Sequence, residues 1–302
     1  MKFSIAKESR IGGRAYQQDR IGHWATSDSL LMVVADGMGG HLYGEVAAQV
    51  ALDHIATEFR RDAKPRLEDP DLFLFRSIGR AHGAILQHAK RASLSEVPRT
   101  VIVACVVQGG YAYWAHVGDS RLYIVRHGTV VARTRDHTIV QQLVDQGRIR
   151  EEAVAFHPDR NKLLQCLGGH QPPRLEPTAS ARLAKDDIVL LCSDGLWGPL
   201  SQRQILTALL SRGLGEAVPA LVSLAEARAG AECDNVSVVA MCWGEEEVAP
   251  RVAPPSAAHQ AKDLEPRTVP NPEAEYLHLS DEDIEKAIDE LRAALRKGRS
   301  AQ

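Results

Sequence analysis

The sequence lacks the features of several protein classes. Its longest apolar run, Val101–Val107, is far shorter than the roughly 20 residues that a membrane-spanning helix needs. No apolar core of a secretory leader follows Lys2, so we expect a cytoplasmic location. An excess of basic residues is also absent, because 36 Lys and Arg stand against 39 Asp and Glu and the net charge is −3. We therefore expect neither a membrane span nor a nucleic-acid partner.

Cysteine is scarce, with five residues in a chain of 302. No pair has the CxxC spacing of a zinc site, and an odd number of cysteines is typical of reduced thiols in a cytoplasmic protein. The chain also lacks a GxGxxG segment after a strand, a phosphate-binding loop of the GxxxxGKS/T type and an internal repeat. These absences argue against zinc modules and the common nucleotide-binding folds.

The composition changes near residue 246. Six of the 15 prolines fall between Pro250 and Pro272, interleaved with small and charged residues. Such a stretch has too few apolar residues to fold alone and favours an extended linker. We therefore predict a folded domain over residues 1–246 and a linker over residues 247–275.

Residues 276–302 carry the signals of a short amphipathic helix. Ser280 can cap its start, and four apolar residues recur at helical spacing on one face. They are Ile284, Ile288, Leu291 and Leu295. Three interpretations stay open, because the Ile284–Leu295 segment could pack back on the domain, dock a partner or belong to a disordered tail. We expect the protein to be a monomer.

Residues 1–246 mix two periodicities. Short runs rich in β-branched residues predict strands, at Leu31–Ala35, Val101–Val107, Tyr111–Val117, Leu122–Val125, Thr129–Ala132, Ile188–Cys192 and Val236–Met241. Helical periodicity predicts helices over Val46–Phe59, Leu72–Ala89, Ile205–Leu210 and Ala217–Ala227. The middle strands are separated by only a few residues, which predicts an antiparallel meander. Strands bracketed by helices indicate an α/β or α+β layered domain.

Four aspartates stand at the borders of predicted strands, each beside a glycine or an asparagine. They are Asp36, Asp119, Asp194 and Asp234, and Asp19 follows a glycine pair nearer the start of the chain. Each one alone is compatible with a simple turn. If several converged on one sheet edge, their charges would repel unless a cation neutralised them. Oxygen ligands without His or Cys favour Mg²⁺ or Mn²⁺.

The residues around these aspartates form a recognisable series. In chain order it reads RAYQQD (residues 14–19), VVADGMGGHLYGE (33–45), HVGDSRLY (116–123), TRDHT (134–138), LLCSDGLW (190–197) and CDNVSVV (233–239). In this order the chain resembles the PP2C (PPM) family of metal-dependent serine/threonine protein phosphatases, of the bacterial type, over roughly residues 1–243. The resemblance implies an α+β fold, a sandwich of two antiparallel β-sheets flanked by α-helices.

The resemblance also implies a centre of two Mn²⁺ or Mg²⁺ ions with a weaker third site. By their matching positions, Asp36 would be the bridging metal ligand and Gly37 a carbonyl ligand. Asp194 and Asp234 would be ligands of the first metal, and Asp119 would help to hold the third.

Four further assignments follow from the same resemblance. Arg14 would bind the substrate phosphate, and Asp19 would orient water held by the metals. Gln18 stands where the family has a glutamate that positions water on the second metal, so this site could be retuned. The segment of about residues 136–170 matches the family's mobile flap. A second departure, Val97-Pro98-Arg99-Thr100, alters the entry to a strand, with no catalytic consequence that we can derive.

The implied activity is hydrolysis of phosphoserine and phosphothreonine in proteins, by a metal-activated water that attacks phosphorus directly. The expected partners are phosphoproteins, including a bacterial Ser/Thr kinase or its targets. A thiol-dependent route is excluded because no Cys is followed by Arg six positions later. Two alternatives stay open: a non-catalytic binding or regulatory module of the same fold, and a phosphatase of small phosphorylated metabolites.

Overall fold

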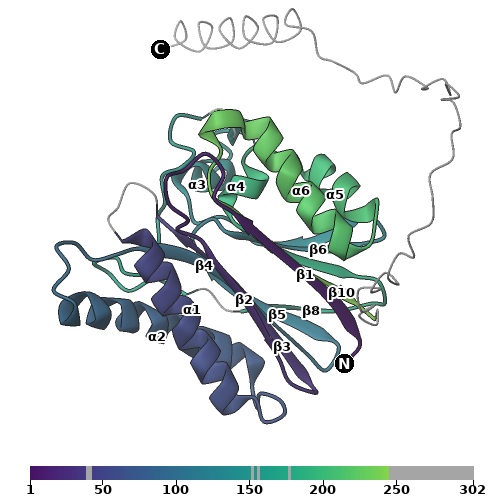
Figure 1. Ribbon diagram of the computed structural model, residues 1–302, viewed down its shortest axis with the longest axis horizontal. Helices are drawn as coiled ribbons and strands as arrows, with labels where there is room; N and C mark the ends of the chain where they lie inside the picture. The colour runs from purple at the N-terminus through teal and green to yellow at the C-terminus, as the bar shows by residue number, and fades with distance from the viewer. Residues whose placement is uncertain (39–42, 151–152, 155–156, 176–177, 245–302) are drawn as a thin grey trace, which may run out of the picture. The chain divides into compact units, whose positions relative to one another are not determined.

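The computed structural model describes residues 1–38, 43–150, 153–154, 157–175 and 178–244. Its core is two five-stranded antiparallel sheets (Figure 1). The first sheet has the order β1 (Phe3–Arg10), β10 (Val236–Trp243), β9 (Ile188–Cys192), β6 (Arg121–Arg126) and β7 (Thr129–Arg133). The second has the order β2 (Arg20–Ala25), β3 (Ser29–Gly37), β4 (Thr100–Gln108), β5 (Tyr111–Val117) and β8 (Ala179–Arg182). The predicted linker 247–275 and helix 276–302 lie outside the described residues.

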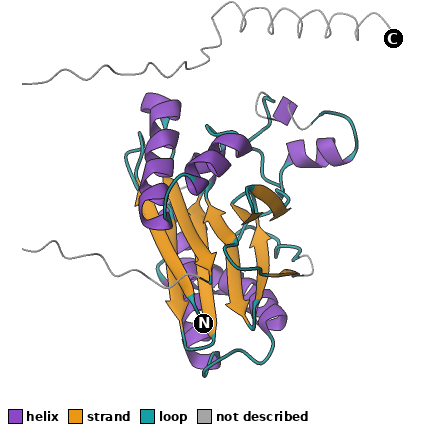
Figure 2. Ribbon diagram, turned by 90° about the vertical axis from the view of Figure 1, so that its right-hand side faces the viewer, coloured by secondary structure: helices purple, strands orange, loops and turns teal. Residues whose placement is uncertain are grey.

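Helices cover the outer face of each sheet (Figure 2). Helices α1 (Gly44–Asp62) and α2 (Pro70–Arg91) pack on the second sheet, and α5 (Gln202–Leu210) and α6 (Leu214–Ala229) pack on the first. Short helices α3 (Ile139–Asp145) and α4 (Asp194–Trp197) and the 3₁₀ turn η2 (Gly230–Glu232) lie in the connections. No helix in the described part of the chain is long and apolar enough to cross a membrane. The predicted sandwich of two antiparallel sheets flanked by helices is confirmed.

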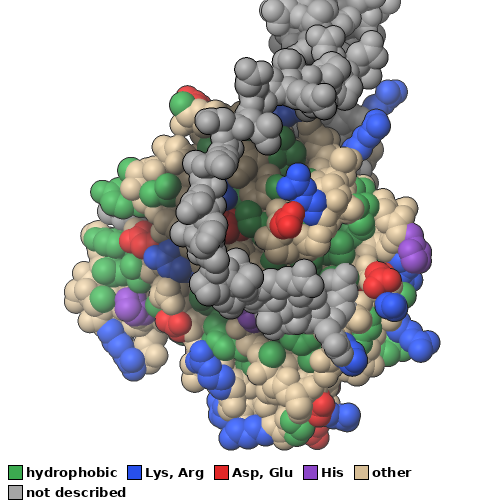
Figure 3. Space-filling view, turned by 45° about the vertical axis from the view of Figure 1, so that its right-hand side comes forward, with side chains coloured by type: hydrophobic (Ala, Val, Ile, Leu, Met, Phe, Trp, Pro, Cys, Tyr) green, Lys and Arg blue, Asp and Glu red, His purple; other side chains and the backbone are tan. Residues whose placement is uncertain are grey.

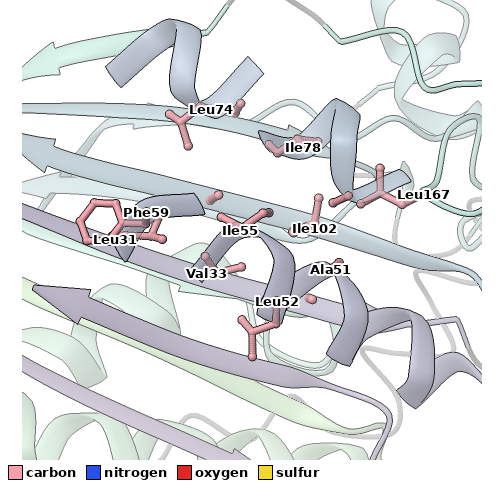
Figure 4. Packing of buried hydrophobic residues seen from close by; sticks show 14 of the residues in the cluster. Leu31, Val33, Ala51, Leu52, Ile55, Phe59, Leu74, Ile78, Ile102 and Leu167 are labelled. Carbon is pink, nitrogen blue, oxygen red and sulfur yellow. The ribbon is translucent and has the colours of Figure 1, made fainter. Parts of the chain in front are cut away.

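The central strands are buried on both faces. In β3, Leu31 and Val33 pack toward Ile55 and Phe59 of α1 (Figure 4). Leu30, Met32 and Val34 of the same strand pack into the cluster between the two sheets. Successive side chains of a strand point to opposite faces, so a strand with two buried faces reads as one continuous apolar run. For this reason the apolar runs in the sequence correctly predicted the strands β3, β4 and β9.

The predicted meander is wrong at one connection. Strands β4 and β5 pair, and so do β6 and β7, but β5 and β6 lie in different sheets. The change of sheet occurs at Gly118, whose φ of +104° and close approach to Val101 exclude a side chain. A short connection can therefore turn a corner between sheets instead of forming a hairpin.

Two glycines bring the start of α1 against the end of β3. A Cβ on Gly37 would lie 2.5 Å from the carbonyl carbon of Gly44, and a Cβ on Gly44 would lie 3.0 Å from that of Gly37. Neither backbone could approach so closely with a side chain present. The close packing fixes the first turn of α1 beside Asp36 at the edge of the second sheet.

Candidate active site

The five aspartates lie at or beside the ends of strands from both sheets, and the other four lie close enough to Asp36 for their charges to act on it. Asp36 lies in β3, Asp119 follows β5, Asp194 begins α4, Asp234 precedes β10 and Asp19 precedes β2. The pKa of Asp36 is raised well above its ordinary value by burial and by the negative charges of the other four. The other four aspartates therefore all lie within electrostatic reach of the Asp36 carboxyl group.

The carboxyl groups of Asp36 and Asp194 lie close enough to interact. Burial and the charge of Asp234 raise the pKa of Asp194 to about 6, and a hydrogen bond with the Asp36 carboxyl opposes part of this rise. Each of these carboxyl groups disfavours ionisation of the other, and a cation between them would remove this penalty.

Asp19 is the most deeply buried member, with 3% of its surface exposed. Ser193 donates a hydrogen bond of 2.9 Å from Oγ to Asp19 Oδ2, and the amide of Ser237 donates in turn to Ser193 Oγ at 3.0 Å. Burial raises the pKa of Asp19 to about 7, against the lowering effect of hydrogen bonds from Ser237 and Ser193. The strand ends of β9 and β10 thus fix the orientation of this carboxyl.

Arg14 lies at the solvent side of the aspartates. Its Nη2 donates to Asp234 Oδ2 at 2.7 Å, and half of its side chain is exposed. The hydrogen bond and the charge of Asp234 raise the pKa of Arg14. The guanidinium is therefore held beside the carboxylates with one face open to solvent.

Asn235 joins the β1–β2 connection to the site, a role that the sequence analysis did not predict. The side-chain Nδ2 of Asn235 donates to the backbone carbonyls of Ile11 and Tyr16 at 2.8 and 3.0 Å. Its Oδ1 accepts from the backbone N–H of Gln18 at 2.7 Å. These three bonds hold the segment that carries Arg14 over Asp234.

A second network of contacts, which the sequence did not predict, holds Asp119 in the connection between β5 and β6. The indole Nε1 of Trp197 donates to the Asp119 carbonyl at 3.0 Å. Arg121 lies 3.5 Å above the Trp197 ring and forms two bonds of 2.9 and 2.7 Å to the buried Asp136. Burial and the charge of Asp194 raise the pKa of Asp119 well above its ordinary value. Trp197 of α4 thereby couples Asp119 to the helix that Asp194 begins.

Gln18 contacts a carboxylate of α1. Its Nε2 donates to Glu45 Oε2 at 3.4 Å, and the same nitrogen would lie 2.7 Å from a Cβ on Gly44. The side-chain amide nitrogen of Gln18 therefore lies against the first turn of α1.

The entry to β4 contacts the end of β3 that carries Asp36. The hydroxyl of Thr100 donates to the Asp36 carbonyl at 2.6 Å, and the Arg99 carbonyl accepts from the Met38 amide at 3.1 Å. Thr100 also pairs with Leu167, at the end of the predicted flap. Arg99 and Thr100 thus contact the end of β3 at Asp36 and the following Met38.

The donor set suits a hard divalent cation, although it is not a complete cage. In the described part of the chain, no three His, Cys, Asp or Glu side chains are arranged to hold an ion by themselves. However, Asp36 and Asp194 form a hydrogen-bonded acidic pair, and the charge of Asp234 acts on it. Mg²⁺ and Mn²⁺ are commonly held by a few carboxylates, with water and substrate oxygens completing the shell. The residues present therefore fit such ions.

Comparisons with known proteins agree with this arrangement. The family model described as Protein phosphatase 2C matches residues 8–218. The serine/threonine protein phosphatase PstP of Mycobacterium tuberculosis is 38% identical over 212 residues, which make up 69% of this chain and 39% of PstP. The chain therefore spans well under half the length of this curated relative.

Solved structures match most of the described domain. The serine/threonine phosphatase of S. agalactiae has a TM-score of 0.72 at 30% identity, and the match covers 80% of this chain and 99% of that one. The catalytic domain of PstP, solved in complex with two manganese ions, has a TM-score of 0.67 at 32% identity, with 80% and 97% covered.

Proposed function

The chain belongs to the protein phosphatase 2C family, and from this premise we propose that it hydrolyses phosphoserine and phosphothreonine in proteins with the help of divalent metal ions. The observation that carries the proposal is the acidic cluster around Asp36, with the Arg14 guanidinium held 2.7 Å from Asp234 at its solvent side. A centre for phosphate-ester hydrolysis needs both, because cations and a guanidinium neutralise the charge of the phosphoryl group.

The proposed ligands of two Mn²⁺ or Mg²⁺ ions are Asp36, the Gly37 carbonyl, Asp194 and Asp234, with Asp119 at a weaker third site. Bound ions of this kind activate water for attack at neutral pH and stabilise the attacking and leaving oxygens. The raised pKa values of Asp36 and Asp194 support the assignment, since a bound cation would favour the ionised form of both carboxyl groups.

Two side chains of the protein would act on the substrate and on water. Arg14 can bind two phosphoryl oxygens in a bidentate manner, which orients the group for in-line attack. Asp19, fixed by Ser193, can accept a hydrogen bond from the attacking water and so hold it in position. Gln18 would support the same water through its amide oxygen.

The proposed substrates are phosphoproteins, among them a Ser/Thr kinase or the proteins that it phosphorylates, in the cytoplasm. The names of the relatives support this substrate class, because PstP and the S. agalactiae enzyme are serine/threonine phosphatases. On the face seen in Figure 3, acidic and basic side chains are interspersed. This pattern agrees with a protein substrate better than with a nucleic acid, which would favour a continuous basic patch.

The substrate class is tested by comparing turnover on different phosphate esters. We expect phosphothreonine and phosphoserine peptides to be hydrolysed with a kcat/KM about tenfold or more above that of small phosphorylated sugars and nucleotides, because remote contacts contribute binding energy. Phosphate release from matched peptides and metabolites, with Mn²⁺ present, measures this. A preference for a metabolite would replace the protein-substrate proposal, and no turnover on any ester would favour the binding module.

A further inference from the structure

An open groove of about 680 Å³ runs along α1. Its walls come from the start of β2, the outer face of α1 and two residues of α2. The lining residues that matter here are Arg20, Glu45, Val46, Gln49, Val50 and Asp53. The groove combines an apolar floor with acidic residues on its rim, and it does not overlap the aspartate cluster.

The groove begins where the active site ends. Glu45, its first acidic residue, accepts the hydrogen bond from Gln18. Arg20 donates to the carbonyls of Gln17 and Asp19, both at 2.8 Å, and its Nε donates to Gln49 at 2.9 Å. The same segment that carries the site residues therefore forms one end wall of the groove.

Two carboxylates, Glu45 and Asp53, line the groove together with the guanidinium of Arg20 and the imidazoles of His54 and His88. Asp53 is exposed and accepts only a neutral hydrogen bond, from Gln49 Nε2 at 3.0 Å, among the interactions between described residues. Within that part of the chain, neither Glu45 nor Asp53 forms an ion pair with Lys or Arg. The three guanidinium contacts of Arg20 are directed to Gln49 and to backbone carbonyls. A cationic side chain can thus pair with Asp53 without displacing a Lys or Arg of the described residues.

We propose that this groove binds the stretch of a substrate protein next to its phosphorylated residue, and that it selects a Lys or Arg there. The inference rests on the proposed function, since it extends the same site. Val46 and Val50 on the groove wall would contact an aliphatic side chain or the stem of the basic residue. Asp53 would bind the charged group.

The geometry of α1 sets the position of the basic residue. Asp53 follows Glu45 by eight residues, which corresponds to about 12 Å along a helix. An extended peptide covers that distance in about four residues, and we allow about one or two more between Glu45 and the phosphate. The basic residue is therefore expected about five or six positions from the phosphorylated one.

An arginine scan of phosphothreonine peptides tests the proposal. Arg is placed at each position on both sides of the phosphothreonine, and kcat/KM is measured for the wild type and for Asp53→Asn, Asp53→Lys and the control Asp62→Asn at the far end of α1. We expect Arg at one position in the window to raise kcat/KM about fivefold, as an exposed ion pair allows. Asp53→Asn should remove this gain, Asp53→Lys should favour Glu at the same position, and Asp62→Asn should keep the wild-type pattern.

Hydrolysis of a small aryl phosphate separates this proposal from the proposed function. It has no flanking residues, so Asp53→Asn should leave its turnover unchanged. A scan without a preferred position, or a gain that survives in Asp53→Asn, overturns the groove proposal while aryl phosphate turnover persists. If the wild-type protein does not hydrolyse the aryl phosphate at all, the proposed function itself is overturned.

Discussion

Replacing Asp36 by Asn is expected to lower phosphate release by about 10³-fold or more while the fold is retained. The charges of all four other aspartates act on Asp36. We therefore expect a cation bound in the cluster to interact most strongly with the Asp36 carboxylate. A cation at such a centre contributes several kcal/mol to the transition state, and each 1.36 kcal/mol corresponds to about a factor of ten. The measurement is kcat/KM for an aryl phosphate with saturating Mn²⁺.

The matched control for this prediction is Asp28→Asn, which neutralises an exposed turn aspartate away from the cluster and should keep wild-type turnover. Calorimetric titration with Mn²⁺ supplies an independent readout, because Asp36→Asn should weaken binding whether or not the substrate is present. Turnover within tenfold of the wild type would show that Asp36 is not a metal ligand.

Without metal ions, the protein is expected to lose stability as the pH rises from about 4 to about 7. The pKa of Asp19 is raised to about 7 and that of Asp194 to about 6, both mainly by burial. Between the ordinary pKa of Asp and these values, the folded protein binds protons that the unfolded chain has released. The free energy of unfolding therefore falls with pH in this window, and Asp19 alone accounts for a loss on the order of 4 kcal/mol.

Urea unfolding in EDTA, at about pH 5 and about pH 8, measures this effect. Asp19→Asn should flatten the pH profile, since an amide has no charge to lose. Added Mg²⁺ should restore stability at the higher pH, because it binds the folded state with its carboxylates ionised. A profile that rises with pH in EDTA would contradict the repulsion among the aspartates.

The sequence predicted the strands that are buried on both faces better than those at the sheet edges. β4 is an unbroken apolar run, whereas β1 mixes charges into Phe3–Arg10 and β2 contains Gly22 and His23. Such strands pair through the backbone and bury only part of their surface, so composition alone does not mark them. β8 was missed for the same reason, with four small or charged residues.

The candidate site was predictable only where a residue type carries the chemistry. An aspartate at a strand end is visible in the sequence, and so is its neighbouring glycine. Asn235, Ser193 and the Arg121–Trp197 contact act through partners that are distant in sequence, and their roles appear only when the two sheets are brought together. The contact of Glu45 with Gln18 likewise depends on the close approach of Gly37 and Gly44.

The central claim is that the aspartate cluster binds divalent cations and hydrolyses phosphate esters with them. Its most direct test is phosphate release from an aryl phosphate by the purified protein, with Mn²⁺, with Mg²⁺ and with EDTA, beside the Asp194→Asn variant. We expect turnover with at least one of the metals, and loss of that turnover both in EDTA and in the variant. Turnover that persists in EDTA, or no turnover with either metal in a sample shown to be folded, would contradict the account.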